Sequence, residues 1–274
     1  MGSEGGKATG EDLLKRGGYL VVLGGGESGT GAAVLGKKEG YEVFVSDRGP
    51  IKESYKDVLI QTGIDWEEGG HTTDLLLKAD LCVKSPGIPD SAPLLVAMRE
   101  AGIPIISEIE FGSWFTTATL IAITGSNGKT TTALLTYHLL KEGGLDVGLG
   151  GNIGDSFALK VVREPHKYYV LEVSSFQLDG IRRFHPHIAV ITNITPDHLD
   201  RYQNTMELYI RAKLRIFENQ MQEDHFIYDL DDPVLSRWIT PGEIRPQTWP
   251  FSLEQSLSKG ACIEENEIHI RTDN

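Results

Sequence analysis

A glycine-rich segment in the middle of the chain has residue types suited to holding a polyphosphate: Gly125-Ser126-Asn127-Gly128-Lys129-Thr130. The glycines permit a sharp turn and let backbone N–H groups approach phosphate oxygens. Lys129 adds a positive charge, and the Thr130 hydroxyl is a suitable Mg²⁺ ligand. Only two residues separate the glycines, against four in the general P-loop, so we interpret this as a shorter variant. An ordinary glycine-rich turn is the alternative.

Two further groups could belong to the same site. A strand expected at 167–171 delivers Glu172, whose carboxylate is a candidate Mg²⁺ ligand, although a carboxylate at the surface edge of the sheet is possible. A strand at 187–191 leads to Asp197 and His198, which should lie at the same sheet edge as Lys129. A structural role for this lone histidine is equally open.

Lys213 lies in an unusual position. A helix is expected over 205–219, and Lys213 falls on its apolar stripe between Ile210 and Phe217. Burial there would lower the pKa of the amine and favour its neutral, reactive form. The alternative is that the side chain extends its charge to solvent.

The elements that must position these groups alternate between strands and helices. An apolar strand at 120–123 precedes the glycine turn, and a helix carrying Leu139 and Leu140 follows it. Further strands are expected at 145–149 and 224–228, and a terminal hairpin joins 261–263 to 268–270.

The N-terminal part repeats the strand–glycine turn–helix pattern. A strand at 19–23 is followed by a glycine-rich segment at 24–31, and the strand at 41–46 ends in Asp47. Asp47 lies about 20 positions after the glycine-rich segment, where a Rossmann-like domain carries an acidic residue that binds a sugar hydroxyl or a base. Tight helix–strand packing without a ligand also fits this pattern. Helices are expected at 51–62, 92–101 and 108–115, and strands at 80–84 and 104–107.

The loop Ser85-Pro86-Gly87-Ile88-Pro89 follows the strand at 80–84. It is rigid, and it lies at the carboxyl edge, where open α/β sheets bind ligands. A rigid connector is the alternative. We therefore predict an α/β protein with a flexible start at 1–10, a Rossmann-like parallel-sheet domain at 11–116, and a P-loop-type α/β domain at 117–274.

Composition limits the possible partners. The 274 residues carry a net charge of −13, which disfavours general binding to nucleic acid or to an anionic membrane. The two cysteines, Cys82 and Cys262, are far apart and argue against a disulfide framework or a zinc site. The chain shows no signal peptide or membrane-spanning run, so we expect a cytosolic protein.

Taken together, the motifs resemble those of the Mur ligases from Tyr19 onward. Thr-Gly-Ser-Asn-Gly-Lys-Thr at 124–130 is similar to the family's ATP loop. The D-glutamate-adding members are resembled most, through segments at 26–29, 85–88, 150–154, 172–178 and 193–200. Within these, Ser-Ser-Phe-Gln-Leu at 174–178 is the most discriminating.

The resemblance implies a role for each matching position. UDP-substrate contacts are implied for Glu27, Ser28, Asp47, Arg48, Ser85, Gly87, Asn152, Ser174 and Gln177. ATP contacts are implied for Gly125, Ser126, Asn127, Gly128, Lys129, Thr130 and Thr131. Two Mg²⁺ ions are implied, on Thr130, Glu172, His198 and a Lys213 carbamylated by CO₂; Lys129, Glu172, His198 and Lys213 are the implied catalytic residues.

The implied substrates are UDP-N-acetylmuramoyl-L-alanine, D-glutamate and ATP. The implied reaction uses ATP to form an acyl phosphate and joins the first two substrates, as a step of peptidoglycan synthesis. The protein is expected to be monomeric. Family members carry a third domain beyond the region matched here, so we expect weak or no turnover from this chain alone. Three alternatives stay open: a non-catalytic UDP-sugar-binding module, a folylpolyglutamate synthase-like ligase, and an NAD-dependent oxidoreductase.

Overall fold

The computed structural model describes residues 17–272, so the start predicted to be flexible at 1–10 lies outside the described residues. The chain divides into two compact units. The first contains residues up to Thr116 together with 155–165 and 180–182, and the second contains the remainder. Two short segments that follow residue 117 in the sequence therefore pack with the first unit.

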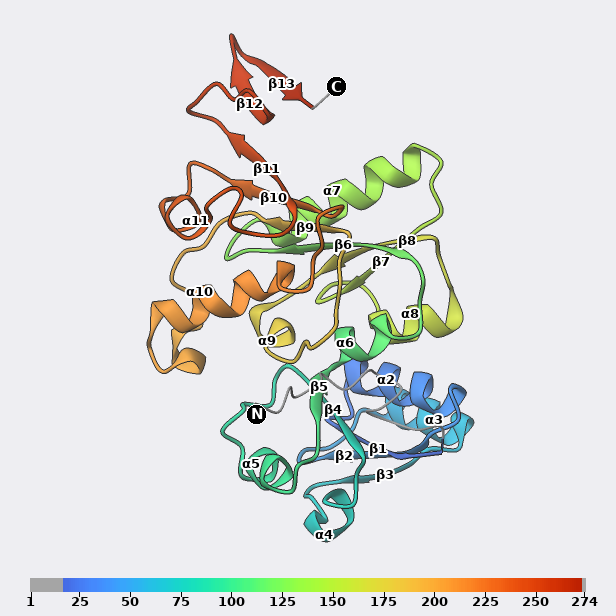
Figure 1. Cartoon of the computed structure of the whole chain (residues 1–274). Coiled ribbons are helices and arrows are strands. Elements are labelled where there is room, and N and C mark those ends of the chain that lie inside the picture. The colour runs from blue at the N-terminus through green and yellow to red at the C-terminus, as the bar shows by residue number, and fades with distance from the viewer. Residues whose placement is uncertain (1–16, 273–274) are drawn as a thin grey trace, which may run out of the picture. The chain divides into compact units, whose positions relative to one another are not determined.

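The first unit is a five-stranded parallel sheet with the strand order β3-β2-β1-β4-β5 (Figure 1). This order matches the Rossmann-like fold predicted from the sequence. Its strands are β1 (Tyr19–Leu23), β2 (Glu42–Asp47), β3 (Asp65–Glu68), β4 (Leu81–Lys84) and β5 (Ile105–Ser107). Its helices are α2 (Glu27–Lys38), α3 (Glu53–Thr62), α4 (Thr73–Leu76), α5 (Pro93–Glu100), α6 (Glu108–Ser113) and α8 (Phe157–Arg163).

The second unit is an eight-stranded sheet with the order β13-β12-β11-β10-β9-β6-β8-β7, parallel except for the terminal hairpin. Its strands are β6 (Thr119–Thr124), β7 (Val147–Gly151), β8 (Tyr168–Glu172), β9 (Ile188–Ile191), β10 (His225–Asp229), β11 (Gln247–Ser252), β12 (Gly260–Glu264) and β13 (Glu267–Arg271). Its helices are α7 (Lys129–Glu142), α9 (Ser175–Leu178), α10 (Met206–Leu214) and α11 (Pro233–Trp238), with 3₁₀ turns η1 (Leu199–Tyr202) and η2 (Arg215–Phe217).

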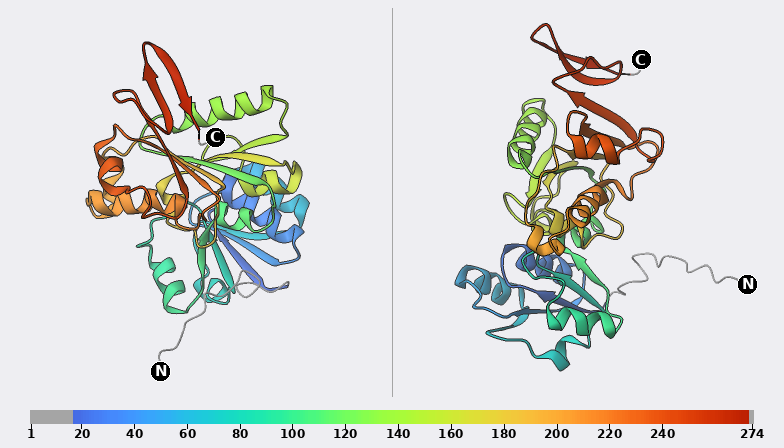
Figure 2. Two further views of the ribbon diagram at one scale, coloured as in Figure 1. Left: turned by 45° about the horizontal axis from the view of Figure 1, so that its top comes forward. Right: turned by 90° about the vertical axis from the view of Figure 1, so that its left-hand side faces the viewer.

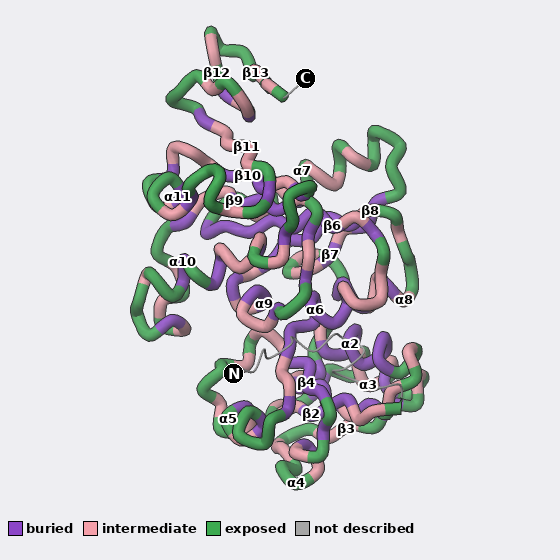
Figure 3. The backbone as a smooth tube through the Cα atoms, in the orientation of Figure 1, coloured by how far each residue is buried: buried purple, intermediate pink, exposed green. Residues whose placement is uncertain are grey.

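Each sheet supplies the apolar core of its unit. In the second unit the core lies around Ile121, Ile123, Val170 and Val190 on the central strands. Figure 3 shows these strands buried, while most residues of the β12–β13 hairpin are half-buried or exposed. Helices α7 and α10 lie on opposite faces of this sheet (Figure 2). The central strands bring the ends of β6, β8 and β9 side by side, because they are parallel neighbours.

Two strands had not been predicted. β3 has the polar sequence Asp-Trp-Glu-Glu because it is an edge strand that pairs only with β2 and is half exposed. β11 contains Pro250, which is disfavoured inside a sheet. It is accommodated because β11 pairs with β12 only at Phe251 and Ser252, beyond the proline.

The helix expected at 205–219 is shorter in the structure. It ends at Leu214 and continues as a 3₁₀ turn. Among the described residues no helix has both the length and the apolar composition needed to cross a bilayer. Cys82 and Cys262 are free, buried thiols.

Glu108 binds the start of α8 through two hydrogen bonds within the first unit. Its Oε1 accepts hydrogen bonds from Ser156 Oγ and the Ala158 backbone N–H, both at 2.6 Å. Its Oε2 is buried with no hydrogen-bond partner among the described residues. Burial raises the pKa of this carboxyl to about 7, against the opposing effect of these two hydrogen bonds.

This raised pKa predicts a pH-dependent stability. The folded chain retains the Glu108 proton up to about pH 7, whereas the unfolded chain releases it near pH 4.5, so stability falls as pH rises between these values. Relative to Glu108→Gln, which cannot ionise, the unmodified chain should lose about 2 kcal/mol of unfolding free energy from pH 5 to 7.5. Urea denaturation at both pH values measures this, and a constant difference between the two proteins would contradict it.

Candidate functional site

The glycine turn after β6 adopts a backbone conformation that requires its glycines. Gly125 has φ +152° and Gly128 has φ +79°, and Gly128 precedes the first residue of α7. A Cβ on Gly125 would lie 1.9 Å from Thr192 Oγ1, so the loop after β9 also demands glycine at this position. The predicted order of strand, turn and helix is confirmed.

Ser126 and Asn127 tie the turn to the loop that follows β9. Their backbone N–H groups donate to the carbonyl and side-chain oxygens of Asn193, each at 2.9 Å. The Ser126 hydroxyl donates to the Thr195 carbonyl at 2.8 Å, accepts from the Thr195 N–H at 2.9 Å and contacts the Tyr209 hydroxyl. The backbone of these two residues therefore holds the loop in shape, while the first N–H groups of α7 have no intrahelical acceptor.

Ser126→Ala is expected to destabilise the second unit. The change leaves the backbone N–H and carbonyl of Thr195 and the buried hydroxyl of Tyr209 without their partner, which costs about 1–3 kcal/mol of unfolding free energy. Urea denaturation at pH 7 measures the loss. Ser258→Ala, at an exposed position of the same unit, is the matched control and should stay within about 0.5 kcal/mol. Equal effects of both substitutions would show that these hydrogen bonds contribute little.

Two lysines converge on one carbonyl oxygen. Lys129 Nζ donates to Gly125 O and Ser126 O, both at 2.9 Å, and Lys213 Nζ donates to the same Gly125 O at 2.7 Å. Lys129 begins α7, whereas Lys213 lies near the end of α10. The amino groups of the two lysines thus lie next to each other at the loop that was predicted to bind phosphate, and the Lys129 ammonium places a positive charge there.

Lys213 is buried, as the apolar stripe predicted, with 2% of its surface exposed. Burial lowers the pKa of its amine to about 7, and the Lys129 charge lowers it further, against a smaller opposing effect of Asp197. The ammonium lies 4.8 Å from the centre of the Tyr209 ring. A substantial fraction of Lys213 is therefore a neutral amine near neutral pH.

Thr130 and Glu172 meet at the ends of α7 and β8. Thr130 Oγ1 donates to Glu172 Oε2 at 2.7 Å, and Asn152 Nδ2 donates to Glu172 Oε1 at 2.9 Å. Glu172 is 1% exposed, so its carboxylate is not the surface-edge group that the sequence left open. Asn152 holds this carboxylate from the loop after β7; its predicted contact with a UDP-substrate stays a prediction.

His198 lies in the loop after β9 with its backbone in the left-handed region, at φ +49°. Its side chain is 62% exposed, packs against the Phe176 ring and lies 3.6 Å from Asp197 Oδ1. These contacts orient the imidazole without joining it to Thr130 or Glu172. Its role as a metal ligand stays a prediction.

Ser174 and Gln177 form a capping box at the start of α9. The Ser174 hydroxyl accepts from the Gln177 N–H at 3.3 Å, and Gln177 Oε1 accepts from the Ser174 N–H at 3.0 Å. Gln177 is 1% exposed. Both polar side chains thus stabilise the local turn, and the ligand contacts predicted for them remain predictions.

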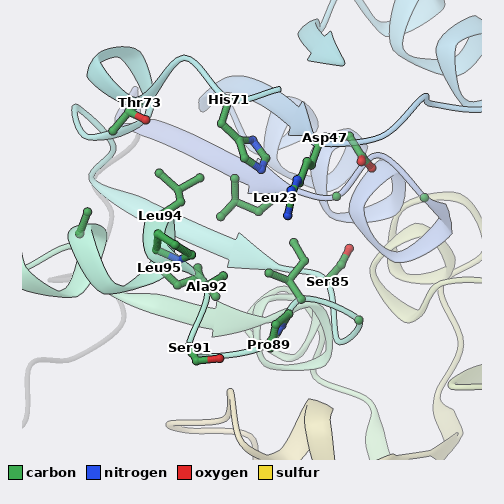
Figure 4. Close-up of a pocket in the computed structure, with 17 residues that line it drawn as sticks. Leu23, Asp47, His71, Thr73, Ser85, Pro89, Ser91, Ala92, Leu94 and Leu95 are labelled. Carbon is green, nitrogen blue, oxygen red and sulfur yellow. The ribbon is translucent and has the colours of Figure 1, made fainter. Parts of the chain in front are cut away.

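The first unit contains a cavity of about 1030 Å³ at the carboxyl edge of its sheet (Figure 4). Of the residues predicted to bind a UDP-substrate here, Asp47, Arg48, Ser85 and Gly87 line it. Glu27 and Ser28 are not among its lining residues. Asp47 also organises the glycine turn, since its carboxylate accepts from the backbone N–H groups of Gly25 at 2.7 Å and Gly49 at 2.8 Å.

The sequence did not single out His71, which also lines the cavity. Its Nδ1 lies 2.7 Å from Ser46 Oγ, and Ser46 Oγ donates to Glu67 Oε1 at 2.6 Å. Glu67 also accepts from the N–H and hydroxyl of Thr72. The short polar run after β3 gave no periodic signal that could have identified this network.

Comparison with known proteins adds two family matches. The Mur ligase middle domain matches residues 123–271, and the MurD N-terminal domain matches residues 20–93. A UDP-N-acetylmuramoylalanine–D-glutamate ligase of Christiangramia forsetii is 55% identical over 255 residues, covering 93% of this chain and 57% of the relative. The enzyme of the same name from Bacteroides fragilis is 55% identical over 251 residues, covering 92% and 56%. The chain thus spans a little over half the length of these relatives.

Solved structures share the fold at low sequence identity. The UDP-N-acetylmuramate:L-alanyl-gamma-D-glutamyl-meso-diaminopimelate ligase of Neisseria meningitides aligns with a TM-score of 0.61 and 20% identity, covering 89% of this chain and 82% of that one. The UDP-N-acetylmuramate-alanine ligase of Thermotoga maritima aligns with a TM-score of 0.54 and 22% identity, covering 87% and 53%. These likenesses concern the fold.

Proposed function

Because the chain belongs to the Mur ligase family, whose middle domain matches more than half of it, we propose that it is the UDP-substrate- and ATP-binding portion of a UDP-N-acetylmuramoylalanine–D-glutamate ligase. The protein would act as a monomer in the cytoplasm, in peptidoglycan synthesis. The observation that carries the proposal is the convergence of Lys129, Lys213, Thr130 and Glu172 on one glycine loop.

ATP is proposed to bind with its terminal phosphates at the start of α7. The N–H groups of Lys129, Thr130 and Thr131 lie in the first helical turn, where they lack intrahelical acceptors. The Lys129 ammonium, now on the carbonyls of Gly125 and Ser126, would exchange these for β- and γ-phosphate oxygens. A charge-assisted contact to phosphate is stronger than one to a neutral carbonyl, so the exchange is favourable.

The neighbouring oxygen ligands fit Mg²⁺. Thr130 Oγ1 and Glu172 Oε2 lie 2.7 Å apart, and Mg²⁺ prefers hydroxyl, carboxylate and phosphate oxygens. When bound, the ion would neutralise charge on the phosphates. Asn152 would keep the Glu172 carboxylate oriented by its hydrogen bond. A second ion held with His198 is the further part of this proposal.

Lys213 is proposed to be carbamylated. Its neutral amine would attack CO₂, so that an N–C bond forms, one C–O π bond of CO₂ breaks and one proton is released; the product is a carbamate anion in place of a neutral amine. The pKa of about 7 supports this, since only the unprotonated amine reacts. Incubation with ¹³C-bicarbonate should give a carbamate resonance in the NMR spectrum that Lys213→Met lacks. A spectrum unchanged by that substitution would exclude the modification at Lys213.

In the proposed reaction the substrate carboxylate first reacts with the γ-phosphate of ATP, although both are anions, and the amide bond forms afterwards. The substrate carboxylate would attack the γ-phosphoryl group of ATP, releasing ADP and giving an acyl phosphate. The amine of D-glutamate would then attack the acyl carbon and lose a proton, and phosphate would leave. Lys129 would reduce the charge repulsion in the first step by neutralising the γ-phosphate.

The cavity of the first unit is proposed to hold the UDP part of the substrate. Its volume of about 1030 Å³ suits a nucleotide diphosphate, and Arg48 supplies a positive charge at its edge. Calorimetric titration with UDP-N-acetylmuramoyl-L-alanine tests the proposal. Saturable binding that Arg48→Ala weakens about tenfold is expected, with exposed Arg163→Ala as the control. Binding of NADH in place of the UDP-substrate would favour an oxidoreductase.

A further inference from the structure

His71 is a polar residue of the cavity to which the proposed function gives no role. The residue follows β3, the outermost strand of the first sheet, and lines the cavity together with Leu23 and Leu94. Figure 4 shows its ring extending from the loop toward Leu23. An imidazole set against apolar side chains at the wall of a ligand-sized cavity is well placed to confer specificity.

The hydrogen bonds around His71 determine which nitrogen carries its proton. A carboxylate only accepts hydrogen bonds, so the single proton of the Ser46 hydroxyl goes to Glu67 Oε1, at 2.6 Å. Ser46 Oγ must then accept from His71 Nδ1–H, at 2.7 Å. Ser46 is fully buried, which keeps water from replacing either partner.

The contacts of Glu67 favour the ionised form of its carboxyl group. Burial raises its pKa, but the hydrogen bonds from Ser46 and Thr72 and the nearby His71 outweigh this, so the pKa lies below its usual value. With Nδ1 as the donor to Ser46, neutral His71 is left with an unprotonated Nε2. This nitrogen is a hydrogen-bond acceptor for a ligand.

The order of the strands indicates which part of a nucleotide His71 would meet. In a Rossmann-like sheet the diphosphate binds at the glycine turn after β1, and the ribose lies near the end of β2. Here Gly24 and Gly26 mark the first position and Asp47 the second. β3 follows β2 outward in the sheet, so His71 lies at the next position along the edge, where the base would be.

We propose that His71 Nε2 accepts a hydrogen bond from the imide N3–H of a uracil base, through a relay in which Glu67 and Ser46 fix the imidazole tautomer. The inference rests on the proposed function, which places a UDP group in this cavity. Leu23 and Leu94 supply apolar surface for the ring of the base. His71 would thus select bases that carry a proton at N3.

Ligands that differ by one methyl group test the inference on the unaltered chain. UDP, 3-methyluridine 5′-diphosphate and 5-methyluridine 5′-diphosphate are titrated by calorimetry. The 3-methyl compound lacks the N3–H and should bind at least about tenfold more weakly than UDP, because it leaves Nε2 unpaired. The 5-methyl compound carries an equal extra methyl group, keeps the N3–H, and should stay within about threefold of UDP.

Variants assign the effect to His71. His71→Phe should weaken UDP about tenfold and reduce the UDP to 3-methyl preference to about one. Ser46→Ala, which removes the acceptor of Nδ1–H, should reduce the same preference in part. His269→Phe, in the second unit, is the matched control and should leave it unchanged.

The outcomes separate the two proposals. If the unaltered chain binds UDP but does not distinguish the 3-methyl compound, or if His71→Phe keeps the preference, the role of His71 is overturned while the UDP cavity stands. If the unaltered chain binds neither UDP nor UDP-N-acetylmuramoyl-L-alanine, the proposed function itself is overturned. The ligand series on the unaltered chain remains decisive even if His71→Phe does not fold.

Discussion

Gly125→Ala is expected to lower the unfolding free energy of the second unit by roughly 3–5 kcal/mol and to abolish ATP binding. Its Cβ would lie 1.9 Å from Thr192 Oγ1 and 3.3 Å from the Asn193 nitrogen, so the loop after β9 must move. The backbone strain of a non-glycine residue at φ +152° adds to this. Because both lysines donate to the Gly125 carbonyl, the displacement also disturbs the phosphate site.

Gly128→Ala is the matched control for this prediction. Gly128 has φ +79°, but a Cβ there meets no atom within 4 Å, so it should cost only the strain of about 1–2 kcal/mol. Adding Thr192→Ala to Gly125→Ala removes the clashing Oγ1 and should restore part of the stability. Urea denaturation and titration with a fluorescent ATP analogue measure both effects. Equal losses for the two glycines would show that the contact with Thr192 is unimportant.

Lys213→Met should change the pH dependence of stability by about 3 kcal/mol. The folded pKa of Lys213 is about 7 and the unfolded pKa is near 10.5, so between these values the unfolded chain binds more protons. The stability contribution of Lys213 therefore rises with pH across this window. From pH 7 to 9.5 the unaltered chain should gain about 3 kcal/mol of unfolding free energy relative to Lys213→Met.

The design of this experiment depends on the groups that face Lys213. Lys129 adds to the lowering of its pKa, and Asp197 opposes it. Burial raises the pKa of Tyr209, so its hydroxyl stays neutral over this pH range. The buffers must exclude CO₂, because a carbamate would change the charge. Exposed Lys167→Met is the control and should show no pH-dependent difference; a flat difference for Lys213→Met as well would mean that its amine is not desolvated.

The sequence by itself determined the features that depend on neighbouring residues. Strand, glycine turn and helix follow one another within a few positions at 19–38 and at 119–142, so apolar runs and glycines were enough to predict the α/β class and its parallel sheets. The apolar stripe of the helix indicated that Lys213 could be buried, and the structure excluded the alternative in which its charge extends to solvent. Carboxyl ends of adjacent parallel strands share one edge, and this rule located Asp47 and Ser85 at the cavity.

Only the tertiary structure decided the contacts between distant residues. Lys129 and Lys213 share a carbonyl oxygen although they are far apart in the chain, and nothing local to either specifies that meeting. The packing of 155–165 with the first unit depends on a buried carboxylate, Glu108, that satisfies the start of α8. His71 reaches the cavity because an edge strand, polar and without a periodic pattern, ends beside β2. Such contacts depend on how the chain closes on itself, which hydrophobic periodicity does not encode.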